Sequence, residues 1–184
     1  EPYRNRIVLP IDEDPDGLYR LVTHELTHIF EFDVIPRGLI TQGVPLWVDE
    51  GLADYMAGVW RPLDLMQVRD VAISDDVPSM TQFQNYGGFA SGRVVYNLGH
   101  AVFEFVEERW GEEGIRQFMF GLRRGAVGGG GDVYEEAFDL TAEEFDDEFK
   151  KYLSDRFEAF RDKERPADYG RNLAPDPLRS KYPV

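Results

Sequence analysis

The sequence predicts a mainly α-helical domain of the α+β class, with a small β element near its start. Apolar residues recur at helical spacing over most of the chain, and only one short early segment has strand character. The chain has 184 residues and no cysteine, and 42% of its residues are hydrophobic, which is enough to form a core without disulfides. We expect one domain over residues 1–165 and a proline-rich tail or linker over residues 166–184.

The composition also restricts the partners that the chain can have. The formal net charge is −15 and the sequence pI is near 4.5, so the surface repels phosphates and nucleic acid is not an expected partner. No run reaches the length of about 18 apolar residues that a membrane helix needs. The chain begins at Glu1, so we expect a processed product or a piece of a longer protein with further domains. The absence of cysteine is compatible with export, and we favour an extracytoplasmic location while leaving the compartment open.

The elements of the first third follow from local patterns. Residues 6–11, RIVLPI, alternate weakly and contain Pro10, which predicts a short strand at a sheet edge. Apolar residues at helical spacing predict a first helix over 17–35. A loop rich in helix breakers, 36–45, then leads to a second predicted helix over 46–60.

The middle of the chain predicts three more helices. Residues 62–73 suit a short helix, and 74–88 suit a loop. Two further helices are expected over 93–109 and 111–125 because both segments have one apolar face. The GGGG stretch at 128–131 predicts a loop, since glycine loses the most backbone freedom on ordering.

The last predicted helix begins with a capping signal. Thr141 and Glu144 have the spacing of a capping box, in which each residue bonds to the backbone of the other. The charged and apolar pattern after Thr141 continues up to Pro166, which predicts the longest helix of the chain.

A short motif, HELTH at residues 24–28, carries the chemistry. His24 and His28 are four residues apart, so on a helix both imidazoles can reach one zinc ion at about 2.0–2.1 Å. Glu25 is rotated by about 100° from His24, which places its carboxylate beside the ion, where it can accept a proton from water. This pattern is typical of a metal-assisted hydrolase. The alternative is two histidines that only cap or pack on a helix.

Catalytic zinc usually has three protein ligands and an open fourth position, so a third ligand must come from elsewhere. Glu50 is the best candidate, because the preceding loop is long enough to fold its helix against the first. His100, in an apolar helix, and Glu31, near His28, are the other candidates. Asp54 lies one turn after Glu50, where it could accept the second ring N–H of a ligating histidine. The alternatives are a helix-start carboxylate for Glu50 and a solvated aspartate for Asp54.

HELTH followed by LWVDEGLADY resembles the gluzincin metallopeptidases, and most closely the peptidase-MA-like domains. In these proteins a HExxH helix and a later W-x-x-E-G helix supply two histidines and a glutamate to zinc. The resemblance implies a zincin-like helical fold, zinc ligation by His24, His28 and Glu50, and activation of water by Glu25. Asp54 is similar to the aspartate that supports a zinc-ligating histidine in thermolysin-type enzymes.

A second resemblance concerns YNLG at residues 96–99, which is similar to the Y-x-K-G stretch of the M1 aminopeptidases. Their tyrosine stabilises the oxyanion, so Tyr96 is a candidate for that role, and the alternative is a buried helix tyrosine. Leucine replaces lysine here, Asp49 replaces asparagine, and the glycine-methionine-glutamate amine-binding motif is not visible before HELTH. Exopeptidase specificity is therefore unsupported.

We expect zinc-dependent hydrolysis of a peptide bond in a peptide or protein substrate, with segments 36–45 and 128–131 as walls or lids of the cleft. Two alternatives stay open. One is a non-catalytic interaction domain with a structural or vestigial metal site, and the other is a zinc hydrolase that acts on a non-peptide amide.

Overall fold

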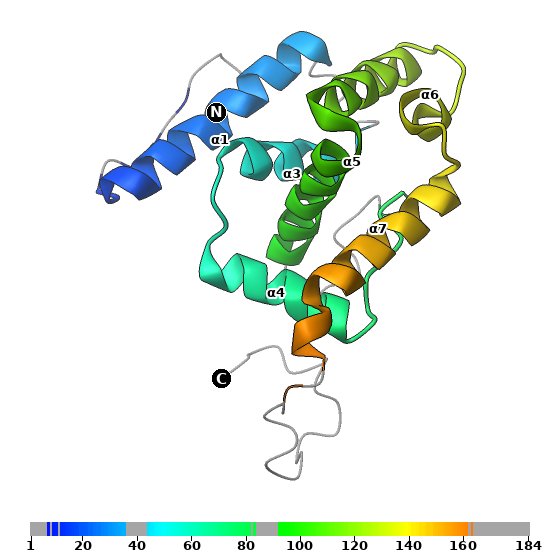
Figure 1. The fold of residues 1–184 in the computed structure, drawn as a ribbon. Coiled ribbons are helices and arrows are strands. Elements are labelled where there is room, and N and C mark those ends of the chain that lie inside the picture. Colours follow the sequence, from blue (N-terminus) through cyan, green and yellow to red (C-terminus); the bar gives the residue numbers. More distant parts are fainter. Residues whose placement is uncertain are drawn as a thin grey trace.

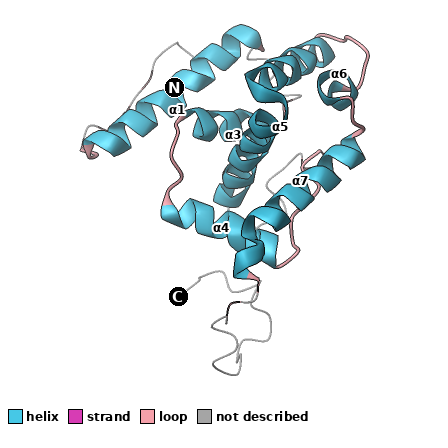
Figure 2. Cartoon of the chain, viewed as in Figure 1, coloured by secondary structure: helices cyan, strands magenta, loops and turns pink. Residues whose placement is uncertain are grey.

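The computed structural model describes residues 7, 9–10, 12–35, 44–81, 83, 92–161 and 163. These residues form helices and connecting loops without any strand, which confirms the mainly helical prediction (Figures 1 and 2). The predicted strand at 6–11 lies partly outside the described residues, and residues 7, 9 and 10 have no regular structure. The strand and the tail at 166–184 therefore stay predictions.

Helix α1, Pro15–Val34, carries the HELTH motif and begins at a side-chain cap. The Asp14 carboxylate accepts hydrogen bonds from the backbone N–H groups of Asp16 and Gly17 at 3.0 and 2.9 Å. Proline at the first helical position has its φ already set for a helix. This cap explains why the helix starts two residues before the predicted Gly17.

Helices α3, Leu46–Met56, and α5, Gly92–Ala126, approach each other backbone to backbone. A Cβ atom on Gly99 would lie 2.2 Å from the carbonyl oxygen of Trp47, and one on Gly51 would lie 2.6 Å from the Gly99 backbone. Only glycine permits this distance at both positions. The close packing fixes the orientation of α3, which carries both Glu50 and Asp54.

Helix α5 is two helical segments joined at a kink. Gly111 has φ 70° and ψ −173°, a conformation that glycine adopts without strain, and the helix changes direction there (Figure 1). The predicted pair of helices on either side of Gly111 is therefore confirmed. The short helix predicted over 62–73 is also confirmed, as α4, Pro62–Ile73.

The C-terminal helices are α6, Val133–Phe138, and α7, Ala142–Phe157, followed by a 3₁₀ turn, Glu158–Phe160. The capping box of Thr141 and Glu144 is present, as predicted. The prediction that this is the longest helix is wrong, because α7 has 16 residues and α1 has 20.

The chain that follows α7 is attached to the end of α4 through Arg161. Arg161 pairs with Asp75 at 2.8 Å and donates to the carbonyl of Ala72 at 3.3 Å, which holds the chain against the end of α4. Asp146, on α7 itself, accepts hydrogen bonds from the backbone N–H groups of Met80 and Thr81 at 2.9 and 3.2 Å. These polar contacts attach α7 and the turn after it to the end of α4 and the loop that follows α4.

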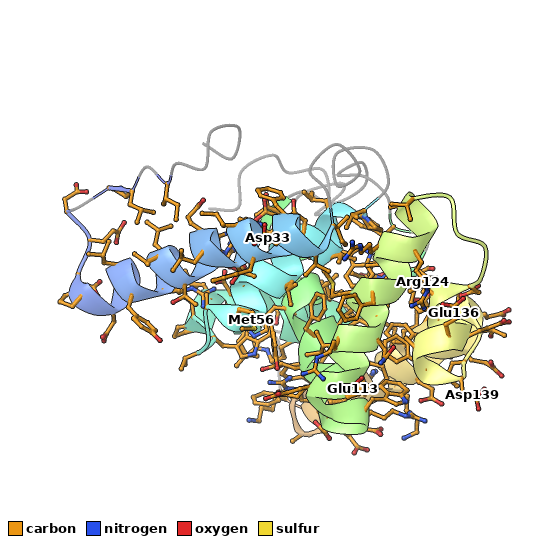
Figure 3. All side chains as sticks on the ribbon, turned by 90° about the horizontal axis from the view of Figure 1, so that it is seen from above. Asp33, Met56, Glu113, Arg124, Glu136 and Asp139 are labelled. Carbon is orange, nitrogen blue, oxygen red and sulfur yellow. The ribbon has the colours of Figure 1, made fainter. Side chains whose placement is uncertain are left out.

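The core lies between α3, α5, α6 and α7 and is largely aromatic. Trp47 stacks on Phe118 with 6.1 Å between ring centres, and Phe118 stacks on Phe138 at 5.5 Å. At the surface, an ion pair between Arg124 and Glu136 joins α5 to α6 (Figure 3). None of the described helices has the length and apolar character needed to cross a membrane.

Helix α1 packs against α3 at the edge of this core, and its two buried residues, Thr27 and Glu31, are polar. Partly buried Phe32 and Val34 near its C-terminal end add apolar contacts. The turns that carry the two histidines are therefore attached to α3 mainly by polar contacts, and these contacts are clustered around the histidines.

Candidate metal centre

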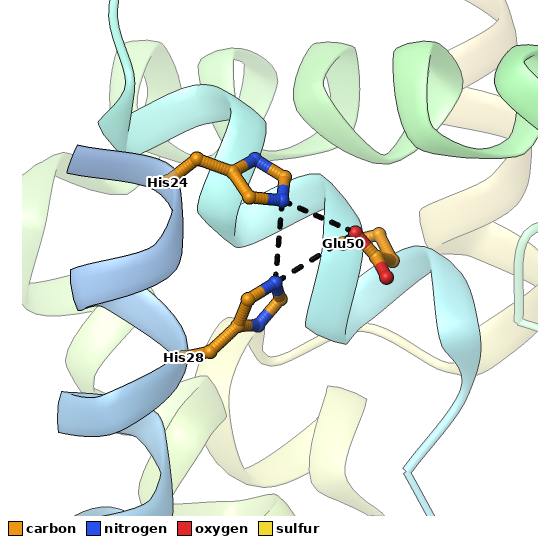
Figure 4. A group of neighbouring side chains, drawn as sticks. All are labelled: His24, His28 and Glu50. Carbon is orange, nitrogen blue, oxygen red and sulfur yellow. Dashed lines mark hydrogen bonds and ion pairs between the residues drawn. The ribbon is translucent and has the colours of Figure 1, made fainter. Parts of the chain in front are cut away.

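His24, His28 and Glu50 converge between α1 and α3 (Figure 4). The Nε2 atoms of the two histidines are 3.3 Å apart. The Oε2 atom of Glu50 lies 3.3 Å from Nε2 of His24 and 3.7 Å from Nε2 of His28. The structure thus brings together the three ligands that the sequence predicts.

The size of this triangle suits zinc. In a tetrahedral site with bonds of about 2.0–2.1 Å, neighbouring ligand atoms are about 3.3–3.4 Å apart. The three observed separations, 3.3, 3.3 and 3.7 Å, allow one ion to lie at about that bond length from every ligand atom. The fourth position of such an ion is available for water, because the described residues add no further ligand to this group.

Both imidazoles are oriented by a carboxylate on the opposite side of the ring. The Nδ1–H of His24 donates to Oδ1 of Asp54 at 3.0 Å, and that of His28 donates to Oδ1 of Asp49 at 2.8 Å. In the neutral, ligating form of each ring, these bonds keep the proton on Nδ1 and leave the Nε2 lone pairs directed at the same point. Asp54 is 3% exposed and is therefore not a solvated surface aspartate.

The cluster favours the charged forms of its histidine and glutamate side chains even without a metal ion. Burial alone would lower the pKa of His28, but the hydrogen bond with Asp49 and the nearby carboxyl groups of Glu31 and Glu50 raise it to about 12. Burial would raise the pKa of Glu50, yet hydrogen bonds with His24 and His28 lower it to about 2. A cation, either a proton or a metal ion, is thus strongly favoured between these groups.

Glu31 is a buried carboxyl group without a hydrogen-bond partner among the described residues. Burial raises its pKa to about 8, so it is protonated at neutral pH. It lies 3.7 Å from Nδ1 of His28, on the side away from the ligand triangle. A second ion between His28, Glu31 and Asp49 does not fit, because the 2.8 Å contact of His28 with Asp49 is a hydrogen-bond distance.

Two arginines also contact the carboxylate of Asp54. Nη2 of Arg20 lies 3.1 Å from Oδ1, and Nη2 of Arg93 lies 2.8 Å from Oδ2. Arg93 also pairs with Asp64 at 3.0 Å. With these charges and the hydrogen bond from His24, the pKa of Asp54 is lowered, although burial acts in the other direction.

The proposed base and the proposed oxyanion donor have different surroundings. Glu25 is partly buried on α1, and no hydrogen bond or ion pair with the described residues holds its carboxylate. Tyr96 is also partly buried, and its ring lies 5.7 Å from the Arg93 guanidinium, beside the ion pairs behind Asp54. The catalytic roles of both residues stay predictions.

His100, the alternative third ligand, lies apart from the cluster. It is 3% exposed and stacks on Trp60 with 3.9 Å between ring centres. Burial lowers its pKa to about 4, with Glu104 as a weaker opposing charge. His100 is thus a neutral core residue.

A groove lies at the N-terminal end of α1, and Arg20 in its wall also contacts Asp54 behind the cluster. Its volume is about 760 Å³, and its walls are residues of the segments 14–20 and 57–62. Tyr19 and Val59 are 72% and 89% exposed at this groove. The glycine stretch at 128–131 joins α5 to α6, on the other side of α5 from α1, so it does not form a lid (Figures 1 and 3). Most of the other predicted lid, 36–45, lies outside the described residues.

Sequence reasoning missed the roles of Asp49, Arg20 and Arg93. Asp49 precedes Glu50 and was notable only as a departure from a family pattern, whereas in the structure it orients His28. Arg20 lies four residues before His24, and this spacing on one helix face could have indicated that Arg20 lies beside the histidine. No local signal identifies Arg93, because its contact with Asp54 depends on how α5 packs on α3.

Comparison of the chain with protein-family profiles, curated proteins and solved structures found no match. The resemblance to gluzincins therefore rests on residues 24–54 alone and stays a prediction.

Proposed function

We propose that the chain is a zinc-dependent peptidase of the gluzincin type, with a zincin-like arrangement of α1 and α3. The observation that carries this proposal is the convergence of two imidazole nitrogens and one carboxylate oxygen, from His24, His28 and Glu50. Glu25, directly after the first histidine, supplies a base that a structural clamp would not need.

In the proposed reaction, His24, His28 and Glu50 hold the ion, while Asp54 and Asp49 keep both imidazoles in the ligating tautomer. When bound, zinc lowers the pKa of a water molecule toward about 7 and polarises the scissile carbonyl. The protein's own contribution is to orient these groups and to move the proton.

Glu25 is the proposed general base. Its carboxylate takes a proton from the attacking water as the new C–O bond forms, and then donates it to the amine nitrogen as the C–N bond breaks. Tyr96 is the candidate donor to the oxyanion. A water proton thus leaves with the amine, and Glu25 returns to its ionised form.

The groove supports a peptide as substrate over a small amide. Arg20 lines the groove and lies one turn before His24 on the same face of α1, so the groove ends one helical turn from the first ligand. Tyr19 and Val59 offer apolar surface to a substrate side chain. Clefts of about 300–1,000 Å³ are typical of ligand sites.

The experiment is a digest of a mixed peptide library by the zinc-loaded protein, with product detection by mass spectrometry. We expect cleavage that a chelator abolishes and that Glu25→Gln reduces by a factor of about 10²–10⁴ while zinc stays bound. Glu135→Gln, at an exposed glutamate of α6, is the matched control and should cleave like the wild type.

The outcomes separate the proposal from its rivals. Zinc binding without cleavage of any peptide would contradict it and favour a non-catalytic interaction domain. Cleavage of simple non-peptide amides alone would favour a zinc hydrolase that acts on a non-peptide amide. Equal cleavage by wild type and Glu25→Gln would show that the activity comes from another site or a contaminant.

A further inference from the structure

The two imidazoles of the candidate metal centre are supported by groups of different charge. Behind His24, the carboxylates of Asp54 and Asp64 are matched by the guanidinium groups of Arg20 and Arg93, so the four charges sum to zero. Behind His28 lie the carboxylate of Asp49 and the protonated carboxyl group of Glu31, and within the described part of the chain no arginine or lysine pairs with either of them.

We propose that Arg20 and Arg93 are positioning residues that act on the metal through Asp54 and lower the affinity of the centre for zinc by neutralising that carboxylate. This inference rests on the proposed metal centre. It goes beyond the proposed ligands, because neither arginine touches the ion and both set how tightly it is held.

The burial of these contacts makes the charges effective. The side chains of Arg20 and Asp54 are only 12% and 4% exposed, so solvent and salt screen this pair less than a surface ion pair. Arg20 shares Oδ1 of Asp54 with Nδ1–H of His24, and it also donates to the carbonyl of Val59 at 3.1 Å. The guanidinium thus draws electron density from the oxygen that would otherwise strengthen His24 as a ligand.

The position of Asp54 does not depend on one arginine alone. Arg93 holds the other oxygen at 2.8 Å, and His24 holds Oδ1 at 3.0 Å. Removal of the Arg20 charge should therefore leave the carboxylate in place and change mainly the electrostatic field at the ion.

The size of the effect follows from the distance. The contacts from Arg20 through Asp54 and His24 place the guanidinium about 8–10 Å from a bound divalent ion. With an effective dielectric constant between those of protein and water, the repulsion between the guanidinium and the ion over that distance corresponds to about a tenfold change in the dissociation constant for zinc.

The test is the zinc dissociation constant, measured by competition with a chromophoric chelator at low ionic strength. We expect Arg20→Gln to bind zinc about tenfold more tightly than the wild type, and Arg20→Lys to stay near the wild type because it keeps the charge. Arg116→Gln, at an exposed arginine of α5, is the control for the change in net charge. Arg93→Gln is the second test variant, since its side chain is 31% exposed and tolerates replacement better.

Weaker or unchanged zinc binding in folded Arg20→Gln and Arg93→Gln would overturn the inference. So would an Arg20→Lys variant that behaves like Arg20→Gln, because geometry and not charge would then matter. If the wild type binds no zinc at all, the proposed metal centre itself fails. If the wild type binds zinc and only the arginine variants disagree, the failure is confined to this inference.

Discussion

Replacement of Glu50 by glutamine tests the ligand cluster most simply, because it removes one charge and keeps the shape. Hydrogen bonds with His24 and His28 lower the pKa of Glu50 to about 2, against an ordinary value of 4.5. This difference corresponds to about 3 kcal/mol of stability of the metal-free protein. For a lowered carboxyl pKa, the contribution is complete above 4.5 and is lost as the pH falls toward 2.

We therefore expect Glu50→Gln to lower the free energy of unfolding by about 3 kcal/mol at pH 7 in the presence of a chelator. It should also weaken zinc binding by at least about 100-fold, which removes about 2.7 kcal/mol of zinc-dependent stabilisation. Urea unfolding followed by circular dichroism, with chelator and with zinc, measures both quantities, and Glu135→Gln is the control. Wild-type stability under both conditions would refute the reasoning about this cluster.

The remaining predictions concern packing and protons. Gly99→Ala should destabilise the protein by about 1–3 kcal/mol, since its Cβ would lie 2.2 Å from the Trp47 carbonyl, whereas Gly125→Ala has open space and should not. Thermal unfolding of both variants measures the difference, and equal stability would contradict the close approach of α3 and α5. Because its pKa is raised, protonated His28 stabilises the metal-free protein fully below pH 6.5, and this stability should fall steadily from pH 6.5 toward about 12. Zinc binding at pH 7 should release the proton of His28, whose pKa is raised to about 12, and calorimetry in buffers of different ionisation enthalpy measures this release.

Much of the helical fold could be predicted where a capping signal and an apolar period agree. Thr141 and Glu144 predicted the start of α7, and Gly111 predicted the break in α5. The six residues of α6 cover fewer than two turns, so they show no clear period. The pattern after Thr141 predicted a helix up to Pro166, whereas α7 ends at Phe157 and passes into a 3₁₀ turn that the pattern does not distinguish from an α-helix.

The candidate site also combines local features, which the sequence predicts, with long-range contacts, which it does not. The spacing of His24 and His28 on one helix face is a local property, so it could be predicted from the sequence. The place of Glu50 required one further assumption, that its helix folds back on the first. The supports of the imidazoles were harder to predict, because Arg93 and Asp49 reach their partners only through the packing of three helices.

The most direct test of the metal centre is the X-ray absorption spectrum of the protein loaded with one equivalent of zinc. The account predicts two imidazole nitrogens and oxygen ligands at about 2.0–2.1 Å, with the imidazole signal lost in a His24→Ala, His28→Ala double variant. A spectrum of bound zinc without imidazole scattering, or one that the double variant leaves unchanged, would contradict it.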